Sequence, residues 1–173
     1  MTDTSTSANQ AVPLIRFTDV SKSFGGAQAL RDISFEIRPG TVHGLVGANG
    51  AGKSTLIRCL AGVNPPDSGS IEIDGELVDI PNPQAAGELG LAFIHQEMSL
   101  IPGWDVLRNM SLGMPLVTAG GLIDWRPMRT KALAVAERLG FSFPLSRQVD
   151  DLSTADQWLV LIGRALMADA RLI

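Results

Sequence analysis

The sequence has one cysteine and no excess of positive charge, and each scarcity excludes a class of protein. Cys59 has no partner within the chain for a disulfide, which fits a reducing compartment and a role in core packing. Asp and Glu number 18 against 14 Lys and Arg, for a formal net charge of −4. Because nucleic-acid binding needs a basic surface, we expect no nucleic acid as a partner, and the charge favours a small ligand or another protein.

Long apolar runs are also missing. The most apolar stretch, residues 158–173, is interrupted by Arg164, Asp169 and Arg171, and so falls short of the ~18 apolar residues that a membrane-spanning helix needs. Residues 1–12 have neither the basic start nor the apolar segment of a secretory signal, and we expect a short disordered tail there. Any role at a membrane is therefore expected to depend on a partner.

The sequence does contain strand patterns in its first half. Its 173 residues are 45% apolar and 18% charged, which suits about one globular domain. Apolar and polar residues alternate over 14–20 and 33–37, which predicts half-buried antiparallel strands. Residues 70–78, with an Asp-Gly pair at their centre, predict a tight hairpin. The shorter apolar segments 41–46 and 91–94 predict buried strands.

Helical periodicity follows the strands. It predicts helices over 53–60, 106–112 and 128–139, the last ending at a glycine, and a further helix from Ser153 to about residue 168. Ser153 and Asp156 form a capping pair, in which each side chain can accept a hydrogen bond from the backbone N–H of the other residue. The two kinds of periodicity together predict a mixed α/β protein.

Residues 47–54, GANGAGKS, match the phosphate-binding pattern G-x-x-x-x-G-K-[ST] between a predicted strand and a predicted helix. Glycines let the backbone curl so that its N–H groups point at phosphate oxygens, and Lys53 would reach the β- and γ-phosphates while Ser54 binds Mg²⁺. A chance glycine-rich turn is the alternative, and the strand and helix on either side argue against it. We expect ATP and Mg²⁺ as ligands. The residues assigned to the nucleotide are Gly47, Asn49, Gly50, Ala51, Gly52, Lys53, Ser54 and Thr55.

Further motifs carry a family resemblance. The P-loop is followed by FIHQE at 93–97 and DLSTADQW at 151–158, with HQEMSLIPGWDVLRNMSLG and GLIDWRPM as further matching stretches. Together these residues resemble the ATP-binding subunits of ABC transporters, and more narrowly the carbohydrate importers of the monosaccharide class. The resemblance covers nearly everything from Leu14 onward.

The resemblance implies an α/β fold with a P-loop NTPase (RecA-like) core, an N-terminal antiparallel β-subdomain and a helical insertion, incomplete at the C-terminus. We expect four parts: the tail at 1–12, the β-subdomain with the P-loop core at 13–96, the helical insertion at 97–152, and the signature helix with the start of a core strand at 153–173. The implied partners are a second nucleotide-binding domain, membrane permease subunits and a separate solute-binding protein, at the cytoplasmic face of the cell membrane.

The resemblance also implies roles for single residues outside the P-loop. Phe24 would stack on adenine, Gln96 would complete the Mg²⁺ and attacking-water environment beside the catalytic Lys53, and Ser153 would contact the γ-phosphate of ATP held by the opposite subunit. The plain alternatives are a turn phenylalanine, a polar residue at a strand end and a helix cap. Residues 98–104 would receive a short helix of the membrane subunit or form the core of the insertion itself.

The sequence departs from the family pattern in two places. Ala155 replaces the glycine of the usual L-S-x-G signature, and its Cβ could crowd a phosphate that glycine lets the backbone approach. The family's Mg²⁺-linked aspartate, catalytic glutamate and switch histidine have no counterpart in this chain. We therefore expect the chain as given to hydrolyse ATP very poorly, since losing a general base costs ~10²–10⁴-fold.

Several hypotheses stay open at this point. The chain would be the leading part of a longer tandem protein or, equally, the product of an incomplete gene model. Its function would be that of an importer ATPase for a sugar or for another solute such as an amino acid. A non-hydrolysing nucleotide-binding module and a soluble P-loop kinase are the competing classes.

Overall fold

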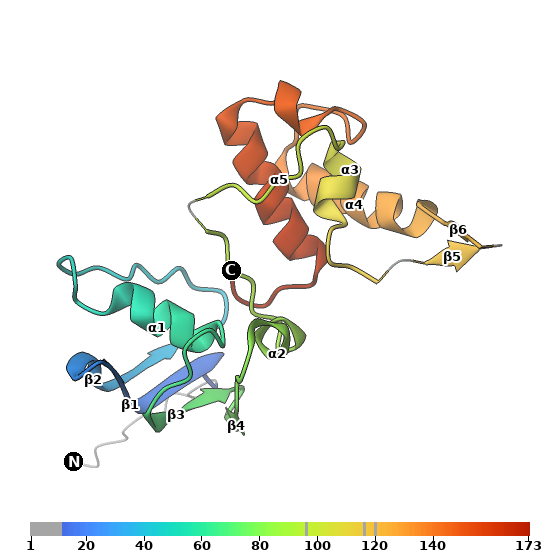
Figure 1. Ribbon diagram of the computed structural model, residues 1–173. Coiled ribbons are helices and arrows are strands. Elements are labelled where there is room, and N and C mark those ends of the chain that lie inside the picture. Colours follow the sequence, from blue (N-terminus) through green and yellow to red (C-terminus); the bar gives the residue numbers. More distant parts are fainter. Residues whose placement is uncertain (1–11, 96, 116, 120) are drawn as a thin grey trace, which may run out of the picture. The chain divides into compact units, whose positions relative to one another are not determined.

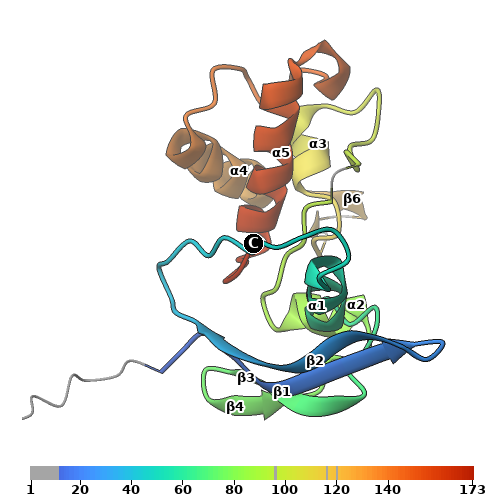
Figure 2. The same cartoon turned by 90° about the vertical axis from the view of Figure 1, so that its left-hand side faces the viewer.

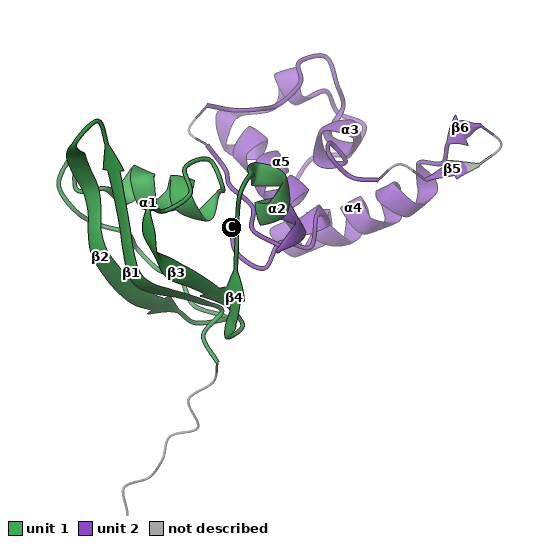
Figure 3. Cartoon of the chain, turned by 60° about the horizontal axis from the view of Figure 1, so that its bottom comes forward, with its two compact units in different colours: residues 1–86 green, residues 87–173 purple. Residues whose placement is uncertain are grey.

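The computed structural model describes residues 12–95, 97–115, 117–119 and 121–173 (Figure 1). The chain divides into two compact units, residues 1–86 and 87–173, and each is described by itself (Figure 3). Of the expected disordered tail, residues 1–11 lie outside the described residues. The four-part division expected from the sequence stays a prediction.

The first unit contains a four-stranded antiparallel sheet. Strand β1 (Ile15–Phe24) lies between β2 (Ala27–Ile37) and β3 (Ser68–Ile73), and β4 (Glu76–Val78) completes the order β2-β1-β3-β4. The turn between β3 and β4 is made by the Asp-Gly pair at 74 and 75, which have φ of 55° and 82°. The predicted antiparallel strands and the predicted hairpin are confirmed.

Helix α1 (Lys53–Leu60) lies along one face of this sheet (Figure 2). Period-two burial is clearest at the start of β1, where Ile15 and Phe17 are buried and Arg16 between them is half-buried. Cys59 is completely buried, which confirms its predicted role in packing. The core of the unit consists of apolar side chains from these strands, the helix and their flanks: Leu14, Ile15, Phe17, Val20, Leu30, Leu56, Cys59, Leu60, Ala61, Ile71, Ile73 and Ile80.

Two aspartates bend the β1–β2 ribbon in the same way. Asp19 and Asp32 have positive φ of 50° and 46°, and the register between the two strands shifts around them. The backbone N–H of Asp19 donates to Ser34 Oγ at 2.8 Å, and that of Asp32 donates to Ser21 Oγ at 2.9 Å. Each irregular residue is therefore held by a serine of the opposite strand, which supplies the hydrogen-bond acceptor that the regular ladder does not.

The predicted strand at 41–46 is wrong for this structure. These residues have no regular secondary structure, and Val42 and Val46 are 101% and 90% exposed. A strand needs a neighbouring strand to pair with its N–H and C=O groups. Within the described part of the chain no strand pairs with this segment, so its apolar pattern alone does not produce the structure.

The second unit is mainly helical. Helices α3 (Val106–Met110), α4 (Arg126–Leu139) and α5 (Thr154–Met167) confirm the three helices predicted in this region. Gly140 ends α4 with φ of 67°, which is the left-handed conformation expected of a glycine at that position. Short elements that the pattern did not predict are the 3₁₀ turn η1 (Val149–Asp151), the hairpin of β5 (Thr118–Ala119) with β6 (Leu122–Ile123), and α2 (Pro83–Glu88) at the boundary of the units.

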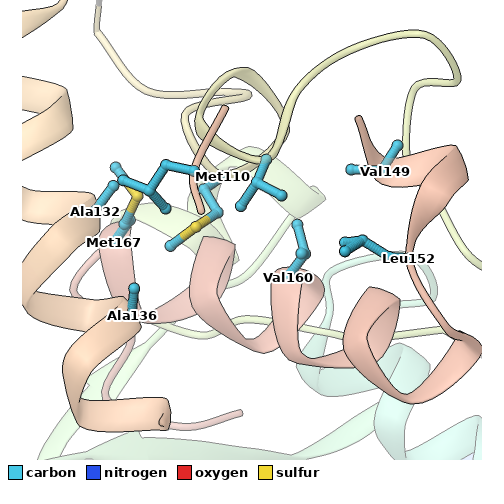
Figure 4. Close-up of a cluster of buried hydrophobic side chains, with 9 residues drawn as sticks. Met110, Ala132, Ala136, Val149, Leu152, Val160 and Met167 are labelled. Carbon is cyan, nitrogen blue, oxygen red and sulfur yellow. The ribbon is translucent and has the colours of Figure 1, made fainter. Parts of the chain in front are cut away.

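The core of the second unit gathers side chains from its three helices and from the segment before α5. Figure 4 draws the side chains of this cluster and labels most of them, among them Met110 and Met167. The cluster consists of Val106, Met110, Ala132, Ala136, Leu145, Val149, Leu152, Val160 and Met167.

The predicted strand at 91–94 is reduced to one residue. Leu91 is buried and forms a single parallel bridge with Leu172, supported by a hydrogen bond of 2.9 Å from the N–H of Ala92 to the oxygen of Leu172. A ladder needs several paired residues, and this pairing stops after one. Among the described residues, no helix is long and apolar enough to cross a bilayer.

Candidate nucleotide-binding site

The glycine-rich loop joins an exposed segment to the start of α1. Its two later glycines, Gly50 and Gly52, have φ of 82° and 88°, a conformation that L-residues with a Cβ rarely adopt. The N–H of Ala51 donates to the oxygen of Ala48 at 3.2 Å, which closes a turn within the loop. The loop therefore curls immediately before the helix, as its sequence predicts.

Gly52 also lies against the sheet. A Cβ placed on it would overlap the backbone oxygen of Ala29 and would sit 2.8 Å from Cδ2 of Leu30. Both contacts are with β2, so the end of the loop is fixed where the helix begins. Glycine is required at this position both for its φ and for its close approach to β2.

Lys53 folds back over the loop. Its ammonium donates to the backbone oxygens of Gly47 and Ala48 at 2.7 and 2.8 Å. The side chain is half-buried, and its positive charge is held beside the curled backbone. Phosphate oxygens are stronger acceptors for an ammonium than neutral carbonyls, so the same side chain is suited to an anion in this loop.

The first turn of α1 leaves its amide groups available. No side chain accepts a hydrogen bond at the N-cap, Gly52, and no acidic residue lies in the first turn. Ser54 is exposed and Thr55 is half-buried, while Asn49 and Ala51 are exposed in the loop. Uncapped amides, the positive end of a helix and an adjacent hydroxyl fit a phosphate group with Mg²⁺, for which Ser54 would be the protein ligand.

Carboxylate ligands for a metal are not gathered elsewhere. The described residues contain no group of three or more His, Cys, Asp or Glu side chains arranged to hold a metal ion. Mg²⁺ in nucleotide sites takes most of its ligands from phosphates and water, with one or two from protein. The serine hydroxyl at the end of the loop is consistent with that mode of binding.

Phe24, the expected adenine platform, ends β1. Its side chain is 45% exposed, and Nζ of Lys22 lies 5.7 Å from the centre of its ring. Phe24 pairs with Ala27 across the β1–β2 ribbon, two residues before the strand position that contacts Gly52. Since a strand rises ~3.4 Å per residue, the position on β2 that pairs with Phe24 is about 7 Å along the strand from the position that contacts the glycine-rich loop. The first unit therefore brings Phe24 and the P-loop together.

The two remaining predicted residues are not part of that group. Gln96 lies outside the described residues. Ser153 is the N-cap of α5 in the second unit, where its Oγ accepts from the N–H of Asp156 at 3.2 Å and donates to Oδ2 of Asp156 at 2.7 Å. The helix cap is thus confirmed for Ser153, although the Asp156 carboxylate bonds the hydroxyl rather than the backbone. Ala155 is exposed one residue after the start of the helix.

The structure adds two residues that the sequence reasoning did not select. Asn109 is completely buried and makes hydrogen bonds to both backbone groups of Ile101, at 2.8 and 3.2 Å. Arg164 donates from Nε to the oxygen of Asn109 at 2.8 Å and from a terminal nitrogen to the oxygen of Ser99 at 3.1 Å. Burial lowers the pKa of Arg164. A sequence signal was present for Arg164, which interrupts the apolar stretch of α5, but not for Asn109, which follows Arg108 in a short helix.

These two residues hold the segment 98–104, for which the sequence left two alternatives. Leu100 packs against the hydrophobic cluster of the second unit, whereas Trp104 remains 37% exposed. The N–H of Gly103 donates to Oδ2 of Asp150 at 2.6 Å. The segment thus contributes to the core of its unit and also presents an exposed aromatic side chain.

Comparison with known proteins agrees with these features. The family model described as ABC transporter matches residues 30–173. The chain belongs to the ABC transporter family. The ribose import ATP-binding protein RbsA of Bacillus licheniformis is 42% identical over 159 residues, covering 92% of this chain and 32% of that protein. The corresponding protein of Rhodococcus jostii is 44% identical over 163 residues, with 94% and 32% covered. The chain therefore spans about a third of the length of the curated relatives it matches.

A solved structure of the ABC transporter family supports the fold. The ADP conformation of MJ1267, an ATP-binding cassette of an ABC transporter, has a TM-score of 0.76 and 26% identity. The match covers 91% of this chain and 66% of that cassette. The expected α/β fold of the P-loop NTPase class is confirmed by this likeness, and the correction at 41–46 concerns one strand within it.

Proposed function

We propose that residues 47–55 of this chain bind ATP with Mg²⁺. The backbone amides of the loop and of the first turn of α1 surround the phosphates, and Lys53 moves its ammonium from the carbonyls of Gly47 and Ala48 to phosphate oxygens. Ser54 supplies its hydroxyl to Mg²⁺, which when bound neutralises phosphate charge. Phe24 stacks on the adenine, and Gln96 completes the environment of the metal and the attacking water.

The observation that carries this proposal is the geometry at Lys53. Its ammonium already lies within 2.8 Å of two carbonyls of the curled loop, and the helix behind it begins without a side-chain cap. An uncapped helix start beside a lysine is an arrangement suited to a polyphosphate. The family membership and the cassette with ADP support the same ligand.

The test of nucleotide binding is a titration of the chain with MgATP. Lys53→Ala is expected to weaken binding by ~10-fold or more, because one strong charge-assisted hydrogen bond to phosphate is lost. Lys131→Ala, which removes a lysine paired with Asp169 in the second unit, is the matched control and should leave the affinity unchanged. Equal affinity for ATP in the Lys53→Ala variant and the wild type would contradict the proposal.

For the whole protein we propose ATP-driven import of a sugar, with ribose as the first candidate. The proposal includes a second nucleotide-binding domain, a membrane permease and a separate solute-binding protein as partners, and a peripheral position at the cytoplasmic face of the cell membrane. It is supported by identities above 40% to ribose import ATP-binding proteins over more than 90% of the chain. Co-purification of a permease with the longer protein, and ribose uptake into vesicles that contain both, are the expected results.

Turnover separates this function from binding alone. We propose that the 173-residue chain hydrolyses ATP weakly, since the family's general base has no counterpart among its residues, and that a longer protein including the following sequence restores turnover. The exposed Ala155, in place of the usual glycine, favours the competing binding-only function. Ala155→Gly in the longer protein should raise turnover if the added Cβ crowds the phosphate, and no turnover in either form would favour the binding-only module.

A further inference from the structure

Asp67 joins three groups at the end of β1. Its carboxylate accepts from Nζ of Lys22 and from the backbone N–H of Ser23, both at 2.7 Å, and its own N–H donates to the oxygen of Ser21 at 2.9 Å. These two hydrogen bonds to the carboxylate lower the pKa of Asp67, which therefore stays ionised at neutral pH. One side chain thus fixes the backbone and a cation just before Phe24.

The contacts explain why β1 remains ordered as far as Phe24. The β1–β3 pairing ends at Ser21 and Ser68, so among the described residues no strand pairs with the β3-facing edge of β1 beyond that pair. Ser23 points its N–H to the same edge as Ser21, because backbone groups two residues apart in a strand share an edge. The Asp67 carboxylate takes the place of the missing strand there.

Lys22 is held in the same arrangement. Its side chain is only 16% exposed, and its ammonium is paired with Asp67. Nζ of Lys22 lies 5.7 Å from the centre of the Phe24 ring. A cation against one face of an aromatic ring is an attractive contact that also restricts the ring. The ring remains 45% exposed, which leaves surface for a planar ligand.

We propose that Asp67 is a positioning residue for nucleobase binding, which holds Lys22 and the end of β1 so that the Phe24 ring is preset to stack on a purine. This inference rests on the proposed binding of ATP and concerns the contribution of the base alone. Asp67 does not touch the nucleotide. Its role is to lower the cost of ordering the ring before the base arrives.

The test compares two ligands that differ in the nucleoside. MgATP carries a triphosphate and a base, whereas inorganic tripolyphosphate with Mg²⁺ carries only the phosphates. Phe24→Ala is expected to weaken MgATP binding by ~10-fold, in line with the loss of one base stack, and Phe24→Trp should restore it. Asp67→Ala is expected to weaken MgATP binding by ~3-fold, in line with one exposed cation–π contact and its ordering. Tripolyphosphate binding should be unchanged in all three variants.

Asp79→Ala is the matched control, because Asp79 is an exposed aspartate of the same unit with no hydrogen bond or ion pair to any described residue. Asp67→Ala with the MgATP affinity of this control would overturn the inference. An equal loss for both ligands would also overturn it, since that result describes a general weakening of the fold. A wild-type chain that binds neither ligand would overturn the proposed function itself.

Discussion

Residues 41–52 and 98–104 both carry expected function, and the structure holds them in opposite ways. The second segment is fixed by buried side chains of its own unit, with Asn109 completely buried beneath Ile101 and Arg164 bound to Ser99. In the first, the hydrogen bonds and close contacts lie within the glycine-rich part and at Gly52, whereas residues 41–46 before it are exposed. Buried side chains fix the whole of 98–104, whereas the contacts of the glycine-rich part leave the valines before it exposed.

The two segments also differ in where their hydrogen-bonding partners lie. Asn109 and Arg164, which bond the backbone of 98–104, belong to the same unit as this segment. The conformation of 98–104 therefore depends on residues within that unit. Residues 41–46 have the apolar character of a buried strand, yet no strand of the described residues pairs with them. The difference shows that apolar character alone does not make a strand when its hydrogen-bonding neighbour is not beside it.

The largest loss of stability is expected from removing the side-chain contacts that fix residues 98–104. Asn109→Ala removes two hydrogen bonds to the half-buried backbone of Ile101 and leaves a cavity at a completely buried site, at a cost of about 3 kcal/mol in the free energy of unfolding of the second unit. All three tryptophans, at 104, 125 and 158, belong to this unit, so fluorescence during urea unfolding reports on it alone. Gln148→Ala, an exposed amide in the same unit, should cost little. A small loss in Asn109→Ala would show that the network is not what holds the segment.

A second expected effect concerns the contact of the glycine-rich loop with β2. Gly52→Ala adds a Cβ against Ala29 and Leu30 at a φ of 88° and should cost about 3 kcal/mol, with loss of MgATP binding. Gly50→Ala has a φ of 82° but nothing within 4 Å, so only the backbone strain of about 1 kcal/mol applies. Hydrogen exchange at the amides of β1 and β2 measures the stability of this unit. Equal costs in both variants would mean that contact with β2 does not fix the loop.

A third prediction compares the same truncation in the two regions. Val160→Ala in the core of the second unit should cost about 2 kcal/mol, because a fully buried side chain loses its packing. Val42→Ala should change stability by less than about 0.5 kcal/mol, because Val42 is completely exposed. Urea unfolding followed by circular dichroism measures both. A cost at Val42 equal to that at Val160 would indicate that residues 41–46 pair as a strand after all.

The sequence predicted those features that depend on neighbours along the chain. The Ser153 cap, the Gly140 helix end and the curled loop before Lys53 are local, and each is found where the pattern placed it. The strands at 41–46 and 91–94 depend on distant partners, and there the prediction was wrong or reduced to the single bridge at Leu91. Local patterns specify turns and caps, whereas a buried strand is specified by the strands beside it.

The candidate site shows the same division. The P-loop residues follow from spacing alone, and Phe24 followed from the family resemblance. Asp67 could not be selected in this way, because its two partners, Lys22 and Ser23, lie more than 40 positions earlier in the sequence and meet it only through the β1–β3 pairing. Asn109 was likewise hidden, since an asparagine in a short helix has no pattern that reveals its burial.

The smallest expected effect lies at the start of α4, where a pair of an exposed arginine and a half-buried aspartate contrasts with the buried network around Asn109. The Arg126 side chain, with its backbone N–H, donates to Asp124 and lowers the pKa of that carboxyl from 3.8 to about 2. A carboxyl whose pKa is lower in the folded state stabilises the fold above its unfolded pKa, and that contribution is lost as the pH falls from about 4 towards 2. Asp124→Asn should therefore weaken the second unit slightly at pH 7, and most of this difference should be lost at pH 2.

Tryptophan fluorescence at a series of pH values measures this contribution, because Trp125 lies between the two residues. Glu137→Gln, an exposed carboxylate later in α4, is the matched control and should shift the urea midpoint equally little at every pH. If Asp124→Asn left the pH dependence of the midpoint unchanged, the pair would contribute nothing to stability. The start of α4 would then depend on its packing through Met128 alone, as a helix does when tertiary contacts outweigh its caps.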